Sequence, residues 1–209
     1  MKDTKETILK TALGLFATNG YNAVSVSMIA DELGVTKGAL YRHYENKRDI
    51  FDSILARMEK LDAERAEKFE LPGQTFSESR EEYLHVSLEK LLSFSKAQFI
   101  YWTEDPFASL FRRMLTLEQY RSPEMTELYQ QYLASGPMEY VKDILAALNI
   151  INPQQKAAEL YAPMFLMYCV YDGAKDKDFI VTTLNSCLEG LYSRLAEEAY
   201  ATDTAGFQA

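Results

Sequence analysis

The sequence predicts an all-α protein of about nine to ten helices, and three observations support this fold class. Apolar residues recur at helical spacing in nearly every periodic segment of the 209-residue chain. No run of alternating Val, Ile, Thr and aromatic residues bounded by turn residues suggests a β-strand. Short breaks containing Pro or Gly separate the periodic segments. The length allows a small domain joined to a larger one.

The chain opens with an amphipathic helix, which we expect over residues 2–18. Asn19 and Gly20 follow this helix, and such a pair can adopt the left-handed conformation that ends a helix. Tyr21 can then fold back onto the last turn as the apolar contact of the cap.

Two shorter helices are expected next. Ser25 is placed to cap a helix that ends at Leu33, and Gly34 then makes a tight turn. Thr36 is placed to cap a third helix over residues 37–43. Three helices therefore fit into the first fifty residues, and we place the end of this first domain at residue 48.

The rest of the chain, residues 49–209, reads as one larger helical domain. Prolines open several of its helices, at positions where the first helical turn tolerates them. The helices after the first three are expected over residues 47–69, 77–103, 106–119, 123–134, 137–148, 153–171 and 178–200.

Export and membrane insertion are both disfavoured by the sequence. The first ten residues carry charges of both signs without an apolar signal core, so we expect a cytoplasmic protein. The best apolar stretch, residues 160–171, is shorter than the roughly 18 residues of a membrane span. Cys169 and Cys187 are expected to be packed thiols in a reducing compartment, with a redox switch as the alternative.

The charge distribution decides whether a nucleic-acid partner is possible. The whole chain has a net charge of -9, which argues against phosphate binding. Residues 1–50 nevertheless carry a net charge of +1, and the acidic excess lies in the other residues. Four cations of the first domain stand between Lys37 and Arg48. A local positive patch is therefore possible on an acidic protein.

The segment from Val26 to Tyr44 has the pattern of a helix-turn-helix. This motif needs a small residue where the helices approach and a glycine four positions later to reverse the chain, which Ala30 and Gly34 provide. Apolar residues that can fix the crossing angle are Ile29, Leu33, Val35 and Leu40. An ordinary αα corner in a helical core shows the same three features, so the pattern alone leaves both interpretations open.

Four stretches of this region follow one another in order: Phe16 to Tyr21, Ile29 to Ala30, Gly34 to Tyr44 and Asn46 to Lys47. Together they resemble the DNA-binding domain of the TetR/AcrR family of transcriptional regulators, without gaps over residues 5–55. The resemblance implies an amino-terminal three-helix helix-turn-helix domain followed by a larger helical ligand-binding and dimerisation domain. It also implies a regulator, most often a repressor, that binds a palindromic operator as a dimer and is released by a small effector.

The resemblance also suggests which residues meet double-stranded DNA. The third helix would point its amino-terminal end toward the bases, where free N–H groups favour nearby phosphates. Residues assigned to the groove are Lys37, Gly38, Ala39 and Arg42. Residues assigned to phosphates are Ser25, Ser27, Thr36, Tyr41, His43 and Lys47.

A small-molecule effector is suggested by the many aromatic and Met side chains in residues 85–171. Packing alone explains any single one of them, but as a group they favour a hydrophobic or aromatic ligand. The candidate pocket residues are Phe99, Trp102, Phe107, Phe111, Met114, Tyr129, Tyr132, Met164, Met167 and Tyr168.

By resemblance, a homodimer would form through the helices over residues 153–171 and 178–200. The last helix carries a row of leucines at helical spacing, Leu184, Leu188, Leu191 and Leu195. This row is consistent with a dimer interface, and it would equally serve an intrachain core.

No enzyme signature competes with a regulatory function. The sequence has no Walker loop, no His-Glu-x-x-His motif and no nucleophile elbow, so we expect no catalytic residue, cofactor or metal. His85 completes only one half of a di-iron helix motif, which needs two copies. The alternatives are a helical regulator that responds to a protein partner and, with less support, an all-helical enzyme with a buried acidic site.

Overall fold

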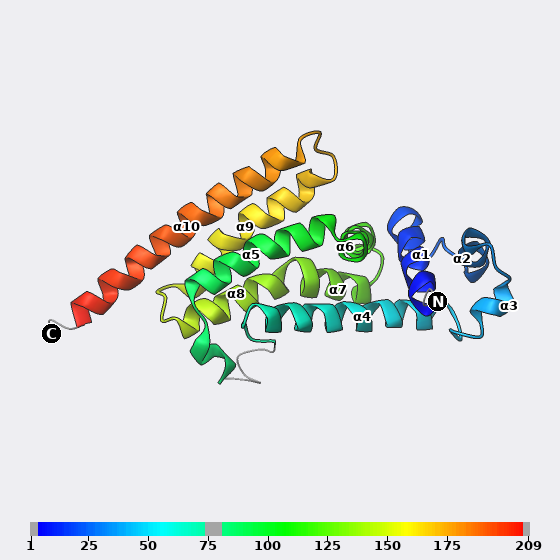
Figure 1. Ribbon diagram of the computed structural model, residues 1–209, viewed down its shortest axis with the longest axis horizontal. Helices are drawn as coiled ribbons and strands as arrows, with labels where there is room; N and C mark the ends of the chain where they lie inside the picture. The colour runs from blue at the N-terminus through cyan, green and yellow to red at the C-terminus, as the bar shows by residue number, and fades with distance from the viewer. Residues whose placement is uncertain (1–3, 74–80, 207–209) are drawn as a thin grey trace. The chain divides into compact units, whose positions relative to one another are not determined.

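The computed structural model describes residues 4–73 and 81–206, and over these residues the chain is helical without a β-strand, as the sequence predicted (Figure 1). The helices are α1 (Thr4–Asn19), α2 (Val26–Leu33), α3 (Lys37–Leu40), α4 (Lys47–Lys68), the 3-10 helix η1 (Glu82–His85), α5 (Leu88–Glu104), α6 (Pro106–Glu118), α7 (Pro123–Leu133), α8 (Ser135–Ala147), α9 (Pro153–Tyr171) and α10 (Lys177–Gly206). None of the described helices is long and apolar enough to span a membrane.

The chain forms two compact units that do not follow the sequence order. The first unit contains the residues up to Asp62 together with Glu104–Tyr129. The second contains Ala63–Thr103 together with the residues from Gln130 onward. Helix α6 and the start of α7 therefore belong to the same unit as α1, α2 and α3. The predicted boundary at residue 48 separates a DNA-binding part from a ligand-binding part of the chain. This functional boundary stays a prediction.

The core of the first unit lies around α1, which packs against α2 and α6. Helix α1 contributes fully buried side chains at Leu13 and Phe16, and α6 contributes Phe111 and Met114. Helices α2 and α6 thus cover the apolar stripe of α1 from two sides. Helix α1 therefore supports the helix-turn-helix from within the core.

The core of the second unit lies around α9, which packs along α8 and α10. The ring of Phe99 stacks on that of Tyr168 at 5.1 Å and meets the edge of Tyr171 at 5.6 Å. In α10, three leucines of the predicted row are buried and Leu191 is half-buried, so this row serves intrachain packing.

Three predicted helices have different ends in the structure. The helix expected over 77–103 begins only at Leu88, because η1 and an extended Val86 precede it; residues 77–80 lie outside the described residues. The Lys90 N–H donates to Ser87 Oγ at 3.2 Å, so this serine caps the first turn of α5. Helix α3 ends at Leu40 instead of residue 43, and α10 continues to Gly206.

Both cysteines are free thiols, in agreement with the prediction that they form no bridge. The prediction that they are packed is wrong, because Cys169 and Cys187 are both exposed. Cys169 and Cys187 lie outside the buried stripes of α9 and α10, which include Tyr168 and Leu188.

Candidate nucleic-acid interface

The turn between α2 and α3 is built from the residues that the sequence singled out. Gly34 has φ 66°, the left-handed conformation that glycine adopts without strain. Its N–H donates to the Asp31 carbonyl at 3.0 Å, and the Val35 N–H donates to the Ala30 carbonyl at 3.0 Å. This pair of bonds ends α2 and reverses the chain into α3.

Both helices of the motif begin at a hydroxyl cap. The Met28 N–H donates to Ser25 Oγ at 3.2 Å, and the Ala39 N–H donates to Thr36 Oγ1 at 3.3 Å. The two capping residues have extended backbone, as an N-cap requires. A hydroxyl has one donor and two acceptor lone pairs, so an oxygen that accepts the cap bond keeps its hydrogen for another acceptor.

Two buried side chains hold the α3 region against the core of its unit. Leu40 is 1% exposed and Tyr44 is buried, and the N–H groups of His43 and Tyr44 both donate to the Leu40 carbonyl. These bonds wind residues 41–43 into a turn after the short helix. The anchors leave the opposite side of the segment in solvent.

Most of the predicted DNA-binding residues are exposed. No carboxylate stands between Glu32 and Glu45 in the sequence, so the surface of α3 is cationic and hydroxylic. The Lys37 ammonium lies 5.7 Å from the centre of the Tyr41 ring, which is itself 47% exposed. The exposed members of the predicted set are Ser25, Ser27, Thr36, Lys37, Gly38, Tyr41 and Arg42. The half-buried members are Ala39, His43 and Lys47.

Lys47 has a different environment from the other predicted phosphate contacts. Its Nζ donates to the carbonyls of Tyr21 and Val24, both at 2.8 Å, and to that of Asn22 at 3.5 Å. It also lies 4.3 Å from the centre of the Tyr21 ring. Burial lowers the pKa of this ammonium. Lys47 therefore holds the turn before α2. Its phosphate contact stays a prediction, and the ammonium would then have to divide its N–H donors between these carbonyls and a phosphate.

The turn held by Lys47 also packs against the core. Gly20 has φ 84° and its N–H donates to the Phe16 carbonyl at 2.9 Å, so the left-handed end of α1 is confirmed. The Tyr21 ring folds back onto Phe16 at 5.2 Å, as predicted, and also contacts Phe51 at 5.0 Å.

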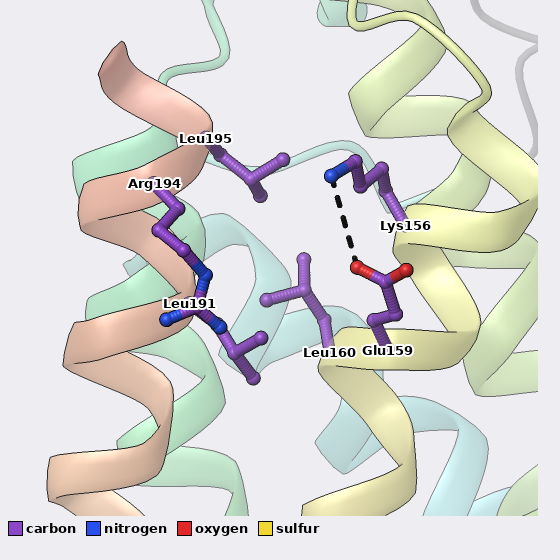
Figure 2. Close-up of a pocket in the computed structure, with 6 residues that line it drawn as sticks. All are labelled: Lys156, Glu159, Leu160, Leu191, Arg194 and Leu195. Carbon is purple, nitrogen blue, oxygen red and sulfur yellow. Dashed lines mark ion pairs between the residues drawn. The ribbon is translucent and has the colours of Figure 1, made fainter. Parts of the chain in front are cut away.

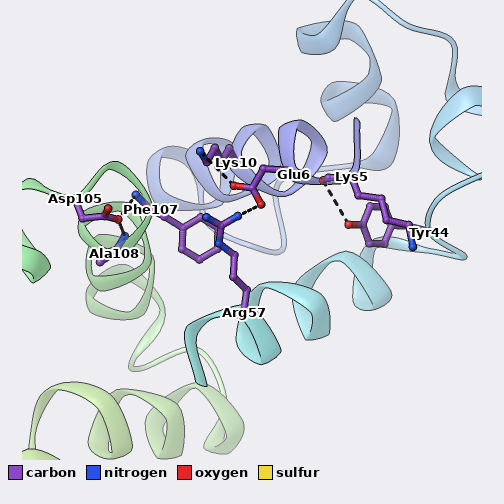
Figure 3. Close-up of polar contacts among 8 residues, drawn as sticks. All are labelled: Lys5, Glu6, Lys10, Tyr44, Arg57, Asp105, Phe107 and Ala108. Atoms are coloured by element: carbon purple, nitrogen blue, oxygen red, sulfur yellow. Dashed lines mark hydrogen bonds and ion pairs between the residues drawn. The ribbon is translucent and has the colours of Figure 1, made fainter. Parts of the chain in front are cut away.

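Sequence reasoning missed a polar cluster that joins α1, α4 and α6 (Figure 3). The Arg57 guanidinium forms an ion pair with Glu6 and lies 4.1 Å from the centre of the Phe107 ring. Asp105 Oδ1 accepts the N–H groups of Phe107 and Ala108, both at 2.9 Å, and so caps α6. An Asp directly before a proline signalled this cap, but no local pattern signals a partner for Arg57.

The predicted ligand-pocket residues are divided between the two units. Phe107, Phe111, Met114 and Tyr129 belong to the first unit, and the other six belong to the second. Within the second unit, the stack of Phe99 on Tyr168 is accompanied by a Trp102–Tyr132 contact at 6.4 Å. Both ring pairs are packed against each other within the pair, and a ligand site among these residues stays a prediction.

A small surface depression lies between α9 and α10 in the second unit (Figure 2). Lys156 and Glu159 face each other at 3.8 Å on its α9 side, and Arg194 extends from α10. Its lining residues are Lys156, Glu159, Leu160, Leu191, Arg194 and Leu195. None of them belongs to the predicted ligand pocket.

The capping role of Ser25 leads to a stability prediction. Ser25→Ala should lower the free energy of unfolding by about 1 kcal/mol, because the Met28 N–H loses its acceptor. Urea denaturation followed by circular dichroism measures this change. Ser27→Ala is the matched control, since Ser27 is exposed on the same helix, and it should stay within about 0.5 kcal/mol of the parent protein. Equal losses in the two variants would contradict the capping role.

Comparison with known proteins links this segment to bacterial regulators. A family model described as "Bacterial regulatory proteins, tetR family" matches residues 8–54, which cover most of α1, all of α2 and α3, and the start of α4. The HTH-type transcriptional regulator AcrR of Shigella flexneri is 34% identical over 140 residues. Residues 8–54 are thus similar to the bacterial regulatory proteins of the tetR family. The match to AcrR covers 60% of this chain and 63% of the relative, so it spans less than two thirds of that protein.

Another relative and two solved structures are also similar to this chain. The HTH-type transcriptional repressor BepR of Brucella suis is 46% identical over 55 residues, which cover 26% of each chain. The structure of SmeT, the repressor of a Stenotrophomonas maltophilia multidrug efflux pump, has a TM-score of 0.60 at 18% identity and covers 92% of this chain and 90% of SmeT. A SmeT–triclosan complex gives the same TM-score and covers 90% and 91%. At this identity the solved structures show a shared fold.

Proposed function

We propose that this protein is a transcriptional repressor that reads duplex DNA through α3 and the start of α2 and leaves it when a small apolar effector binds. The observation that carries this proposal is the exposed surface around α3, which presents cations and hydroxyls without a carboxylate. A net charge of -9 would otherwise oppose contact with DNA, so the local surface matters more than the total charge.

Different residues on this surface have different proposed tasks. Lys37 and Arg42 are long exposed cations that can reach base edges in the major groove, while Gly38 and Ala39 allow the backbone to come close. Phosphate oxygens are acceptors, and the Ser25 and Thr36 hydroxyls can still donate to them while they cap their helices. Ser27, Tyr41, His43 and Lys47 complete the proposed phosphate contacts, which position the protein without reading sequence.

A palindromic operator contains two equivalent half-sites, and each is bound by one helix-turn-helix, so we propose a homodimer. The surfaces of α9 and α10 offer an apolar face for this contact. Phe165 is 36% exposed, Leu166 58% and Val170 42% on α9, and Phe179 is 64% exposed on α10. Large apolar side chains exposed together on neighbouring helices are typical of a protein interface. This face supports the dimer proposed from the family resemblance.

The proposed effector is small and hydrophobic or aromatic. SmeT, a relative in fold, was solved in complex with triclosan. In this chain, the candidate contacts within the second unit are Phe99, Trp102, Tyr132, Met164, Met167 and Tyr168. An effector can release DNA only if it binds the DNA-free conformation more tightly than the DNA-bound one. A regulator that responds to a protein partner remains the second candidate, and it predicts no thermal stabilisation by small molecules.

A titration with DNA tests the proposed function directly. Fluorescence anisotropy should show binding to the duplex from upstream of the chain's own coding region at concentrations at which a shuffled duplex of equal length stays free. Raising the salt concentration should weaken both interactions because counterions compete for the phosphates. Equal affinity for the two duplexes, or no binding to either, would contradict the proposal.

The proposed dimer leads to a second prediction. Leu166→Glu should shift the protein toward monomers and weaken operator binding, because a charge would be buried at the centre of the apolar face. Sedimentation velocity measures the oligomeric state. Glu197→Gln, a change at an exposed polar position of α10, serves as the control. A monomeric parent protein, or a Leu166→Glu variant that dimerises normally, would refute this interface.

A further inference from the structure

Glu118, the last residue of α6, is a buried acid that the proposed function does not use. It is only 2% exposed. A carboxylate that leaves water requires hydrogen bonds and a nearby positive charge to compensate for the lost hydration. The partners of Glu118 therefore indicate what the residue does.

The first partner is the backbone of the turn between α1 and α2. Glu118 Oε1 accepts the N–H of Tyr21 at 3.2 Å, across 97 positions of sequence. A Cβ atom at position 20 would lie 2.6 Å from the same oxygen. Gly20 is thus required twice, once for its left-handed backbone and once for the close approach of the carboxylate.

Lys47, at the start of α4, contacts the same turn. Burial lowers the pKa of the Lys47 ammonium, and the negative charge of Glu118 acts in the opposite direction and raises it. The same ammonium holds the carbonyls of Tyr21, Asn22 and Val24. The turn is therefore held from two sides, since α6 takes its N–H group and α4 takes its carbonyls.

The held turn leads directly into the proposed DNA-binding surface. Val24 is buried at 1% exposure, and the next residue is Ser25, the N-cap of α2. Any shift of the turn would move the start of α2 and the Ser25 hydroxyl with it. The position of these groups thus depends on a carboxylate that is itself too deeply buried to reach DNA.

We propose that Glu118 is a positioning residue for DNA binding, which acts with Lys47 to fix the turn that precedes α2. The inference rests on the proposed function for its DNA readout. Its structural half, the bond between Glu118 and the Tyr21 amide, can be measured without DNA.

The decisive variant is Glu118→Gln, which keeps the shape of the side chain and removes its charge. We expect operator affinity to fall about tenfold, because a hydrogen bond to a charged acceptor becomes a neutral one and Lys47 loses its counter-charge. A fall in affinity would be informative, because the removal of a negative charge should by itself strengthen binding to DNA. Glu127→Gln is the matched control, because it removes the same charge from an exposed position of α7 in the same unit.

Two further measurements separate positioning from a general loss of stability. In amide NMR spectra, the Tyr21 N–H resonance should move upfield in Glu118→Gln and stay in place in Glu127→Gln. In a double-mutant cycle of operator affinity, Glu118→Gln and Lys47→Met should be less than additive, because both act on one turn. Glu118→Asp keeps the charge and should lose less affinity than Glu118→Gln.

The proposal is overturned if folded Glu118→Gln binds the operator as well as the parent protein or better, or if the cycle is additive. An unchanged Tyr21 resonance would refute the hydrogen bond itself. If the parent protein binds no operator while the Tyr21 resonance still moves, the proposed function fails and the contact between Glu118 and the turn stands.

Discussion

Replacing Lys37 and Arg42 together with alanine should lower operator affinity by at least about 30-fold while the protein stays folded. Each lost contact to a base edge removes about 1–3 kcal/mol of binding free energy, and about 1.4 kcal/mol corresponds to a tenfold change. Both side chains are exposed, so their removal should change the free energy of unfolding by less than about 0.5 kcal/mol. Anisotropy titrations and urea denaturation measure the two quantities.

The matched control for this variant is Lys68→Ala combined with Lys175→Ala, which removes two positive charges at exposed positions of the second unit. This control should bind the operator within a few-fold of the parent protein, because distant surface charges are screened beyond about 10 Å at ordinary salt. If both double variants lost affinity equally, net charge would explain the effect and the assignment of α3 to the groove would be wrong.

Phe111→Ala should destabilise the protein by about 3–5 kcal/mol, the usual loss when a buried phenylalanine leaves a cavity. The side chain is fully buried in α6, within the unit that α1 and α2 also form. The sequence placed Phe111 among the residues of a ligand pocket, where a ring that borders open space could be truncated at a smaller loss. Thermal or urea unfolding therefore distinguishes a core residue from a pocket wall.

An exposed aromatic residue outside the proposed dimer face provides the control for this second variant. Tyr120 is 90% exposed after α6, and Tyr120→Ala should change the free energy of unfolding by less than about 0.5 kcal/mol. A small loss in Phe111→Ala, comparable to that of the control, would return Phe111 to the list of ligand contacts.

The sequence predicted best those elements whose ends are set by local chemistry. Ser25 and Thr36 are hydroxyl residues at helix starts, and Gly34 supplies the left-handed backbone between them. Each of these signals acts within a few residues, so periodicity and capping rules were sufficient to place α2 and the start of α3. The start of α5 was missed because the apolar pattern continues through Val86 and Ser87, although the serine is the cap.

Contacts between distant parts of the sequence could not be predicted in this way. Nothing near Glu118 indicates that its carboxylate accepts the Tyr21 N–H, and nothing near Lys47 indicates that its ammonium is occupied by carbonyls. Helix patterns show which face is apolar, but they do not show which other helix covers it. For this reason α6 was assigned to the sensing part of the chain, whereas it packs against α1.

The two exposed thiols can be alkylated, and the rate of alkylation reports on how accessible they are. Cys169 stands on α9 next to Val170 and one turn from Leu166, within the apolar face proposed for dimerisation. A maleimide dye can therefore label the protein without an introduced cysteine and without touching the helix-turn-helix, which contains no thiol. The rate of alkylation at this position measures how much of the time a second subunit shields the face, and it can be followed during a titration with effector.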